Sequence, residues 1–330
     1  MKRRYPNTRA RRLRSKTSIR NLVKETSLNT NDLIQPIFLV NGKNKKQKIK
    51  SMPDIERMSI DNAIKYIRKL KNLGVGAIAL FPHIERKLKS SDAAEAYNPD
   101  GLIQRAINEI KSKVENINII SDVALDPYTI HGQDGLLSKK GEILNDETVE
   151  VLAKQAVSHA AAGADIVAPS DMMDGRIKKI RESLERNHFK DTIILSYAAK
   201  YSSNFYGPFR EAVGSQENLG SSKKDTYQMD YRNANEALKE VELDINEGAD
   251  IVMVKPGLPY LDIVKEIKNK FNIPIFVYQV SGEYSMIKAA AKNGWLNEKE
   301  VVMEALACMK RSGANAIITY YAKNVLEWMK

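Results

Sequence analysis

The chain alternates short apolar segments with longer segments in which apolar residues recur at helical spacing. Eight apolar segments are rich in Val and Ile, almost free of polar residues, and bounded by Gly, Pro, Asp or Asn. This pattern is typical of parallel strands that are buried on both faces. The predicted strands span residues 33–40, 75–81, 117–125, 164–170, 192–199, 249–255, 273–280 and 315–321.

The segments between these strands have the periodicity of amphipathic helices, as in residues 60–70. A second such helix is expected to begin at Asn145 or Asp146, either of which is a good N-cap. Several helices run into a glycine that is followed at once by a strand, a junction that uses the ability of glycine to adopt positive φ. These glycines are Gly74, Gly163, Gly248 and Gly313. Eight βα units with such short connections predict an α/β fold, a closed (β/α)8 TIM barrel; a doubly wound open sheet is the alternative.

The first 32 residues precede the barrel and form a basic N-terminal arm, whereas residues 33–330 form one catalytic barrel domain. Within residues 1–16, eight Lys and Arg occur without any acidic residue, out of a net charge of +11 for the whole chain. We expect this arm to pack on a neighbouring subunit. Binding of nucleic acid by the arm is the alternative, but no nucleic-acid partner is expected because the remaining 314 residues are close to neutral.

Composition excludes several other classes of protein. No apolar segment approaches the roughly 20 residues that a membrane span needs, and the basic N-terminus lacks the apolar core of a secretory signal. We therefore expect a cytoplasmic protein with no membrane partner. Cys308 is the single cysteine of the chain, so neither an internal disulfide nor a thiolate cluster for zinc can form.

Two lysines end consecutive predicted strands, Lys200 in the fifth and Lys255 in the sixth. Neighbouring strands lie about 4.8 Å apart, so both amines can enter one pocket at the rim where TIM barrels carry out catalysis. Mutual repulsion and burial would lower their pKa values toward neutrality, as an amine nucleophile requires. We predict that at least one forms a Schiff base with a carbonyl substrate. Alternatively, each lysine extends from its strand end into solvent.

A long polar segment, from Tyr201 to Tyr231, separates the two lysine strands. It is longer than an ordinary βα loop and contains aromatic residues and glycines, which favours a lid that closes over an anionic group. Arg210 can bind a carboxylate in bidentate fashion, and Lys224 adds a point charge. No glycine-rich phosphate-binding motif occurs, so no nucleotide cofactor is indicated.

Another dense polar segment follows the third strand and contains Asp122, Asp126 and Asp134. These carboxylates could orient an amine or bind a hard cation. The alternative is that they only stabilise turns next to Pro and Gly.

Five long motifs, in this order and spacing, resemble the porphobilinogen synthase (5-aminolevulinate dehydratase) family: DVALDPYTIHGQDG, SYAAKYSSNFYGPFREA, TYQMDYRNANEAL, MVKPGLPYLDIV and YQVSGEYSM. The resemblance covers nearly the whole chain. It implies a hydro-lyase that condenses two molecules of 5-aminolevulinate to porphobilinogen with loss of two waters, an early step of tetrapyrrole (heme) biosynthesis. It also implies an α/β barrel that forms homo-octamers through its N-terminal arm, with no organic cofactor. A class I aldolase, which also uses a barrel lysine, is the nearest alternative.

The same resemblance implies roles for individual residues. Lys255 matches the principal Schiff-base lysine of the family, and Lys200 matches the lysine that holds the other substrate molecule. The order in which the C–C and C–N bonds form stays open. The other positions that match substrate contacts are Arg210 and Lys224 for the carboxylate of the second substrate, Ser281 and Tyr320 for that of the first, and Asp122 and Ser170 near the amino end of the second.

The chain departs from the zinc-dependent members of this family, which carry three cysteines where this sequence has Ala124, Asp126 and Asp134. Without thiolates, no zinc is expected at the active site. The aspartates resemble those of the magnesium-responsive type, in which Mg²⁺ acts as an allosteric ion away from the active site. Glu240 matches its carboxylate ligand. Whether Asp126 and Asp134 also bind a cation is left open.

Overall fold

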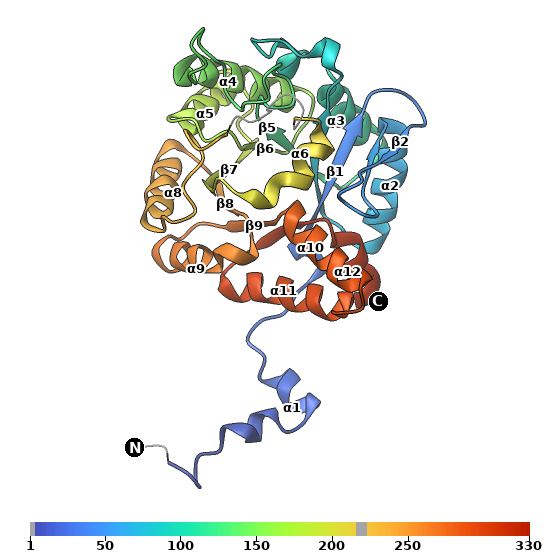
Figure 1. Ribbon diagram of the computed structural model, residues 1–330, viewed down its shortest axis with the longest axis vertical. Coiled ribbons are helices and arrows are strands. Elements are labelled where there is room, and N and C mark those ends of the chain that lie inside the picture. Colours follow the sequence, from blue (N-terminus) through green and yellow to red (C-terminus); the bar gives the residue numbers. More distant parts are fainter. Residues whose placement is uncertain (1–3, 216–222) are drawn as a thin grey trace.

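The computed structural model describes residues 4–215 and 223–330. Within them, eight parallel strands form a closed barrel surrounded by helices (Figure 1). The last strand pairs with the first, at Leu33 with Ile317 and at Ile34 with Ile318. This pairing confirms the TIM barrel and excludes the doubly wound open sheet. The barrel strands are β1 (Leu33–Val40), β4 (Ala77–His83), β5 (Asn118–Val123), β6 (Ile166–Pro169), β7 (Ile193–Lys200), β8 (Ile251–Lys255), β9 (Ile275–Gln279) and β10 (Ala316–Thr319).

Helices follow the strands in sequence and pack their apolar faces against the outside of the barrel (Figure 1). Gly74 and Gly248 end two of them in the left-handed conformation, with φ of 103° and 105°, as the glycine pattern predicts. Asn145 begins a helix as expected, but the N-cap is Leu144. The helices are α2 (Ile60–Leu73), α3 (Leu102–Lys113), α4 (Asn145–Ala161), α5 (Arg176–Arg186), α6 (Gly207–Val213), α8 (Asn235–Glu247), α9 (Leu261–Lys270), α10 (Ser281–Lys292), α11 (Glu298–Ser312) and α12 (Ala322–Met329).

A short hairpin that the apolar pattern does not predict follows β1. Its strands, β2 (Lys46–Lys48) and β3 (Glu56–Met58), are antiparallel, and β3 also pairs in parallel with the end of β1. Single-turn 3-10 helices fill several connections: η3 (Arg86–Leu88), η4 (Ala94–Tyr97), η5 (Asn204–Tyr206) and η6 (Leu258–Tyr260). The hairpin therefore extends the carboxyl rim of the barrel next to α6.

The N-terminal arm extends away from the barrel (Figure 1). It contains η1 (Ala10–Arg14), α1 (Thr17–Leu22) and η2 (Thr30–Asp32), and none of residues 4–31 is buried. Two of the arm's basic residues, Lys2 and Arg3, lie outside the described residues. Across residues 4–215 and 223–330, we find no helix with the length and apolar character that crossing a membrane would need.

Candidate active site

The two predicted lysines are partners in the register of β7 and β8. An irregularity in β7 produces this pairing, because Ser196 lies opposite Val252 while Ala199 lies opposite Val254. One additional residue on β7 therefore places Lys200, and not Ala199, beside Lys255, so the two side chains leave the sheet on the same face. Their exposed fractions are only 5% and 6%. The alternative in which each lysine extends into solvent is thus wrong.

Lys255 lies in a cage of four aromatic rings, with its amine nitrogen 4.6 to 5.2 Å from each ring centroid. Burial, followed by the charge of Lys200, lowers the pKa of Lys255 to about 7, although Asp122 acts in the opposite direction. A large share of this amine is therefore neutral and nucleophilic at neutral pH. The ring faces can also stabilise a positively charged iminium. The rings belong to Tyr197, Tyr206, Phe209 and Tyr278.

Lys200 has polar surroundings instead. Its amine donates a hydrogen bond to the backbone carbonyl of Ser170 and lies 3.5 Å from the carboxylate of Asp134. Ser170, which was predicted as a substrate contact, thus reaches Lys200 through its main chain and is itself buried. The two lysines therefore occupy one rim in chemically different environments.

Asp126 and Asp134 both bind Lys224. The lysine nitrogen lies 3.2 Å from Asp126 and 2.7 Å from Asp134, and Tyr227 donates a 2.8 Å hydrogen bond to Asp134. Burial alone would raise the pKa of Asp134, but Lys200 and Lys224 outweigh it and hold that pKa at about 2. The two carboxylates thus serve as ion-pair partners, and a cation bound between them would have to displace the Lys224 ammonium group.

Asp122 is the acidic neighbour of Lys255. Burial raises the pKa of Asp122 to about 7 against the lowering effect of Lys255, and one of its carboxylate oxygens is buried without a hydrogen-bond partner. A carboxyl group that titrates near neutrality can accept and return a proton during catalysis. Asp122 lines the cavity together with Lys200 and Lys255, and its role near the amino end of the second substrate stays a prediction.

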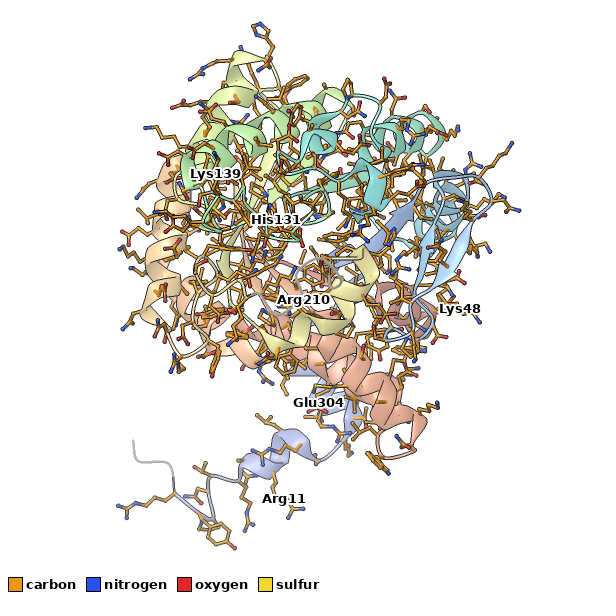
Figure 2. The ribbon with its side chains drawn as sticks, turned by 45° about the horizontal axis from the view of Figure 1, so that its top comes forward. Arg11, Lys48, His131, Lys139, Arg210 and Glu304 are labelled. Carbon is orange, nitrogen blue, oxygen red and sulfur yellow. The ribbon has the colours of Figure 1, made fainter. Side chains whose placement is uncertain are left out.

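Arg210 lies on α6, over the mouth of the barrel, whereas Arg11 lies far away on the arm (Figure 2). Arg210 lines the same cavity as the two catalytic-site lysines and Lys224. This cavity is narrow, with a free volume of about 30 Å³. Because that space holds only one or two waters, the side chains around it must separate to admit a substrate.

The lid helix α6 is anchored by residues that sequence reasoning did not identify. Arg57 of β3 donates hydrogen bonds to the carbonyls of Glu211 and Ala212, at 2.5 and 2.6 Å. The Glu211 carboxylate in turn accepts hydrogen bonds from the backbone amides of Lys50 and Ser51. The hairpin therefore fixes the carboxyl end of α6, while residues 216–222 of the predicted lid lie outside the described residues.

Ser281 and Tyr320, the predicted contacts of the first substrate, border the Lys255 cage. The Ser281 hydroxyl accepts a 2.9 Å hydrogen bond from the backbone amide of Phe209, a cage residue. The Tyr320 hydroxyl lies 3.0 Å from that of Tyr278, another cage residue. The two predicted contacts of the first substrate thus both contact residues of the Lys255 cage. The predicted contacts of the second line one cavity together with both lysines: Asp122, Ser170, Arg210 and Lys224.

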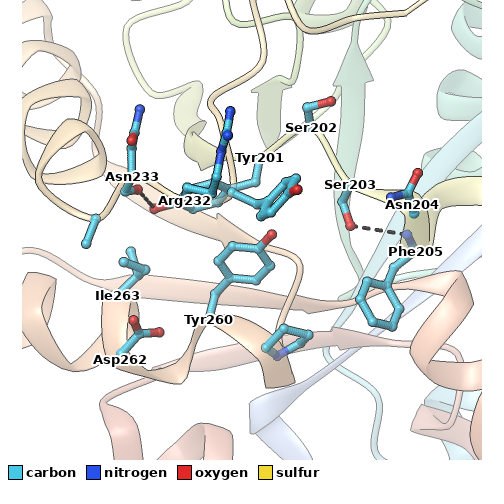
Figure 3. Close-up of a pocket in the computed structure, with 13 residues that line it drawn as sticks. Tyr201, Ser202, Ser203, Asn204, Phe205, Arg232, Asn233, Tyr260, Asp262 and Ile263 are labelled. Carbon is cyan, nitrogen blue, oxygen red and sulfur yellow. Dashed lines mark hydrogen bonds between the residues drawn. The ribbon is translucent and has the colours of Figure 1, made fainter.

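The loops that follow the two lysines pack against each other on their outer side, where a groove of about 430 Å³ opens to solvent (Figure 3). Tyr201 and Tyr260 stack there, with ring centroids 4.3 Å apart. The Tyr201 amide also donates a 3.0 Å hydrogen bond to the carbonyl of Lys255. The stacked rings and this hydrogen bond hold the two lysine loops together, and the two lysine side chains themselves line the narrow cavity and not this groove.

Glu240 lies apart from these residues, on α8. It lines a separate groove of about 440 Å³ together with other carboxylates. Burial raises the pKa of Glu240, and nearby Asp244 adds to that effect. Among residues 4–215 and 223–330, no group of three or more His, Cys, Asp or Glu is arranged to hold a metal ion.

The fold and this rim are those of a TIM barrel with two buried lysines at one cavity. Residues 7–328 match the family model described as delta-aminolevulinic acid dehydratase. The chain is 51% identical over 322 residues to the delta-aminolevulinic acid dehydratase of Bradyrhizobium diazoefficiens, covering 98% of this chain and 91% of that protein. It is 49% identical over 321 residues to that of Bacillus subtilis, covering 97% and 98%.

A solved structure agrees with these relatives. Delta-aminolevulinic acid dehydratase (porphobilinogen synthase) from Toxoplasma gondii, in complex with the reaction product porphobilinogen, has a TM-score of 0.95 and 47% sequence identity. The comparison covers 97% of this chain and 91% of that one. The chain belongs to the delta-aminolevulinic acid dehydratase family, and it is an enzyme, a hydro-lyase. This family membership rules out the alternative interpretation, in which the chain is a class I aldolase.

Proposed function

We propose that this enzyme condenses two molecules of 5-aminolevulinate to porphobilinogen, with loss of two waters, and that each lysine holds one molecule as an imine. The observation that carries this proposal is the pairing of two buried lysines, Lys200 and Lys255, at one cavity. One ketone needs one amine, and joining two identical ketones needs two. The names of the relatives support the same reaction.

The neutral amine of Lys255 attacks a substrate ketone, and loss of water gives an imine. Protonation turns this imine into an electron sink, so the adjacent carbon can lose a proton and form the new C–C bond. Asp122, which lines the same cavity and has a pKa near 7, can accept and return that proton. That bond forms to the imine carbon of the molecule held on Lys200. A substrate amino group then attacks the imine carbon on Lys255, which closes the ring and expels the Lys255 amine, and elimination of the Lys200 amine with loss of ring protons gives the pyrrole.

The two substrate carboxylates are bound on opposite sides of the cavity in this proposal. Arg210 and Lys224 bind that of the second substrate, and Lys224 is held ready by its ion pairs. Ser281 and Tyr320 bind that of the first, beside the aromatic cage. Ser170 contributes its carbonyl to the position of Lys200.

We further propose that the enzyme is of the magnesium-responsive type and that Glu240 is a ligand of an allosteric Mg²⁺. Mg²⁺ usually retains several waters and needs only one or two protein carboxylates, which fits a single Glu240 in a groove with neighbouring Asp174 and Glu236. A bound cation would offset the crowding of negative charge there. Titration with MgCl2 should release or absorb heat with the wild type and not with Glu240→Ala; identical heats would contradict this ligand.

We propose, in addition, how the subunits assemble and where in the cell the enzyme acts. The arm exposes apolar side chains, including Leu22 at 80% and Leu13 at 57%, and these would be covered in a homo-octamer whose arms pack on neighbouring barrels. We also propose that the enzyme is cytoplasmic, which agrees with its single free thiol at Cys308. Light scattering should give an octamer for the full chain and a smaller species after deletion of residues 1–32.

The reaction itself is tested by incubating the enzyme with 5-aminolevulinate and Mg²⁺ and measuring porphobilinogen with a colour reagent for pyrroles. Product should accumulate at one molecule per two substrate molecules consumed. Consumption of substrate without a pyrrole product, or no consumption, would contradict the proposed function.

A further inference from the structure

A buried carboxylate, Glu283, joins the two loops that carry Lys255 and Ser281. It lies in the first turn of α10 with an exposed fraction of 2%. One of its oxygens accepts hydrogen bonds from the amides of Gly257 and Val280, at 3.1 and 2.8 Å, and the other accepts from Leu258 at 2.8 Å. No salt bridge involves Glu283 in the part of the chain that the structure describes.

The three amides belong to two different βα connections. Gly257 and Leu258 follow Lys255 within three residues, and Val280 directly precedes Ser281. A single side chain therefore holds the strand end that bears the reactive amine and the helix start that bears a predicted carboxylate contact. The capping arrangement at α10, in which Glu283 accepts from its own N-cap residue, accounts for only one of the three bonds.

The backbone around Glu283 is tightly packed at two glycines, Gly257 and Gly282. A Cβ atom at Gly257 would lie 2.7 Å from the Met309 methyl and 3.3 Å from a Glu283 oxygen. A Cβ atom at Gly282 would lie 2.6 Å from the carbonyl of Phe205, in the loop that leads into the lid. Glycines at both positions allow the two loops and the lid to approach the carboxylate.

We propose that Glu283 is a positioning residue, which sets the direction of the Lys255 side chain relative to Ser281 by holding both loops through their amides. This role rests on the proposed imine chemistry at Lys255. Glu283 itself is not placed to touch the substrate, because both of its oxygens accept hydrogen bonds from backbone amides and it does not line the cavity of the lysines. Lys200 lies on another strand, and its polar contacts are to Ser170 and Asp134.

The substitution Glu283→Gln removes one acceptor oxygen and puts an amide donor in its place. At least one backbone N–H then faces another donor in a buried site, which costs more than the loss of an ordinary hydrogen bond. The loop after Lys255 is expected to shift, whereas the contacts of Lys200 stay unchanged. A small misplacement of a reacting group can lower a rate by up to about a hundredfold.

The test measures imine formation at each lysine separately. The probe is 4-oxopentanoate, a keto acid that lacks the amino group of 5-aminolevulinate, trapped with cyanoborohydride and located by peptide mass spectrometry. In Glu283→Gln, trapping at Lys255 should be roughly tenfold slower, and trapping at Lys200 should change less than about twofold. Equal rates in variant and wild type, or equal slowing at both lysines, would overturn the positioning role.

A matched control lies at the amino end of β8, the strand that ends at Lys255. The Asp250 carboxylate also accepts a backbone hydrogen bond, from Ile194 at 2.8 Å, but at the amino end of β8. Asp250→Asn should leave both trapping rates unchanged, and a selective loss at Lys255 in this control would overturn the assignment to Glu283. A wild type that traps the probe at neither lysine would contradict the proposed function itself.

A second variant keeps the test decisive if Glu283→Gln does not fold. Glu283→Asp retains the charge but is one methylene shorter, so it cannot reach all three amides. Slower trapping that is confined to Lys255 is expected, by roughly threefold. Wild-type rates at Lys255 in this variant would overturn the proposal.

Discussion

Lys255 and Lys200 are the same residue type, paired in register on adjacent strands, and yet their surroundings have little in common. Four aromatic rings surround the amine of Lys255, and its pKa is lowered to about 7. Lys200 instead contacts a carbonyl and the carboxylate of Asp134. An apolar cage favours a neutral nucleophile, whereas Lys200 is held by a hydrogen bond and an ion pair. Because the surroundings of the two amines differ, we expect the two lysines to have different parts in the proposed reaction and not to be interchangeable.

The largest expected effect comes from removing each amine in turn. Lys255→Met should lower the rate of porphobilinogen formation by at least about 10⁴-fold, because the first nucleophile is lost. Lys200→Met should lower it by about 10²-fold to 10³-fold, because the second substrate loses its anchor but the first imine still forms. Steady-state rates at saturating 5-aminolevulinate check this order. Equal losses in the two variants would contradict the division between the lysines.

The polar surroundings of Lys200 should contribute to stability, and those of Lys255 much less. Asp134→Asn breaks a buried ion pair, which we expect to lower the free energy of unfolding by about 3 kcal/mol. Because the folded pKa of Asp134, about 2, lies below an unfolded value of about 3.9, this contribution is present above pH 4 and is lost as the pH falls toward 2.

Urea denaturation at pH 7 provides the measurement. Glu109→Gln, which breaks the exposed pair with Lys113, serves as control and should cost less than about 1 kcal/mol. If Asp134→Asn lowered the free energy of unfolding by no more than this control does, the buried ion pairs around Lys200 would not stabilise the folded protein.

The smallest expected effect concerns helix α6, whose Phe209 and Arg210 line the cavity shared by both lysines. Arg57→Ala removes the two hydrogen bonds that anchor α6, so Arg210 and Phe209 should be less well placed. We expect KM to rise roughly fivefold while kcat changes less than about twofold, because neither lysine is altered. Arg68→Ala, which removes an exposed arginine bonded to the carbonyl of Lys113, is the control. A fall in kcat with unchanged KM would contradict a role in substrate binding.

The sequence contained enough information for the fold and for the choice of the two lysines. Uninterrupted apolar segments predict buried parallel strands, and their ends predict the rim, so both lysines could be located without coordinates. The additional residue in β7 could not be predicted, since Tyr197 and Ala198 continue the apolar segment and carry no signal of a bulge. Without it, Ala199 would lie beside Lys255.

Other site residues were missed because their roles arise from tertiary packing. Tyr197 and Tyr278 have the sequence signature of ordinary core residues, and only barrel closure brings both rings to Lys255. Arg57 lies in a hairpin with no strong strand pattern, and Glu283 has the appearance of a helix-capping residue. The family motifs contain Glu283 but do not say which backbone amides it binds.

The most direct test of the difference between the lysines is the pH dependence of imine trapping at Lys255, with 4-oxopentanoate and cyanoborohydride in the wild-type enzyme. The attacking amine must be neutral, so a pKa near 7 predicts that the rate at Lys255 rises about tenfold from pH 6 to pH 8 and then levels off. A rate at Lys255 that is negligible at pH 7 and continues to rise tenfold per pH unit up to pH 9, as for an unperturbed lysine, would contradict the account.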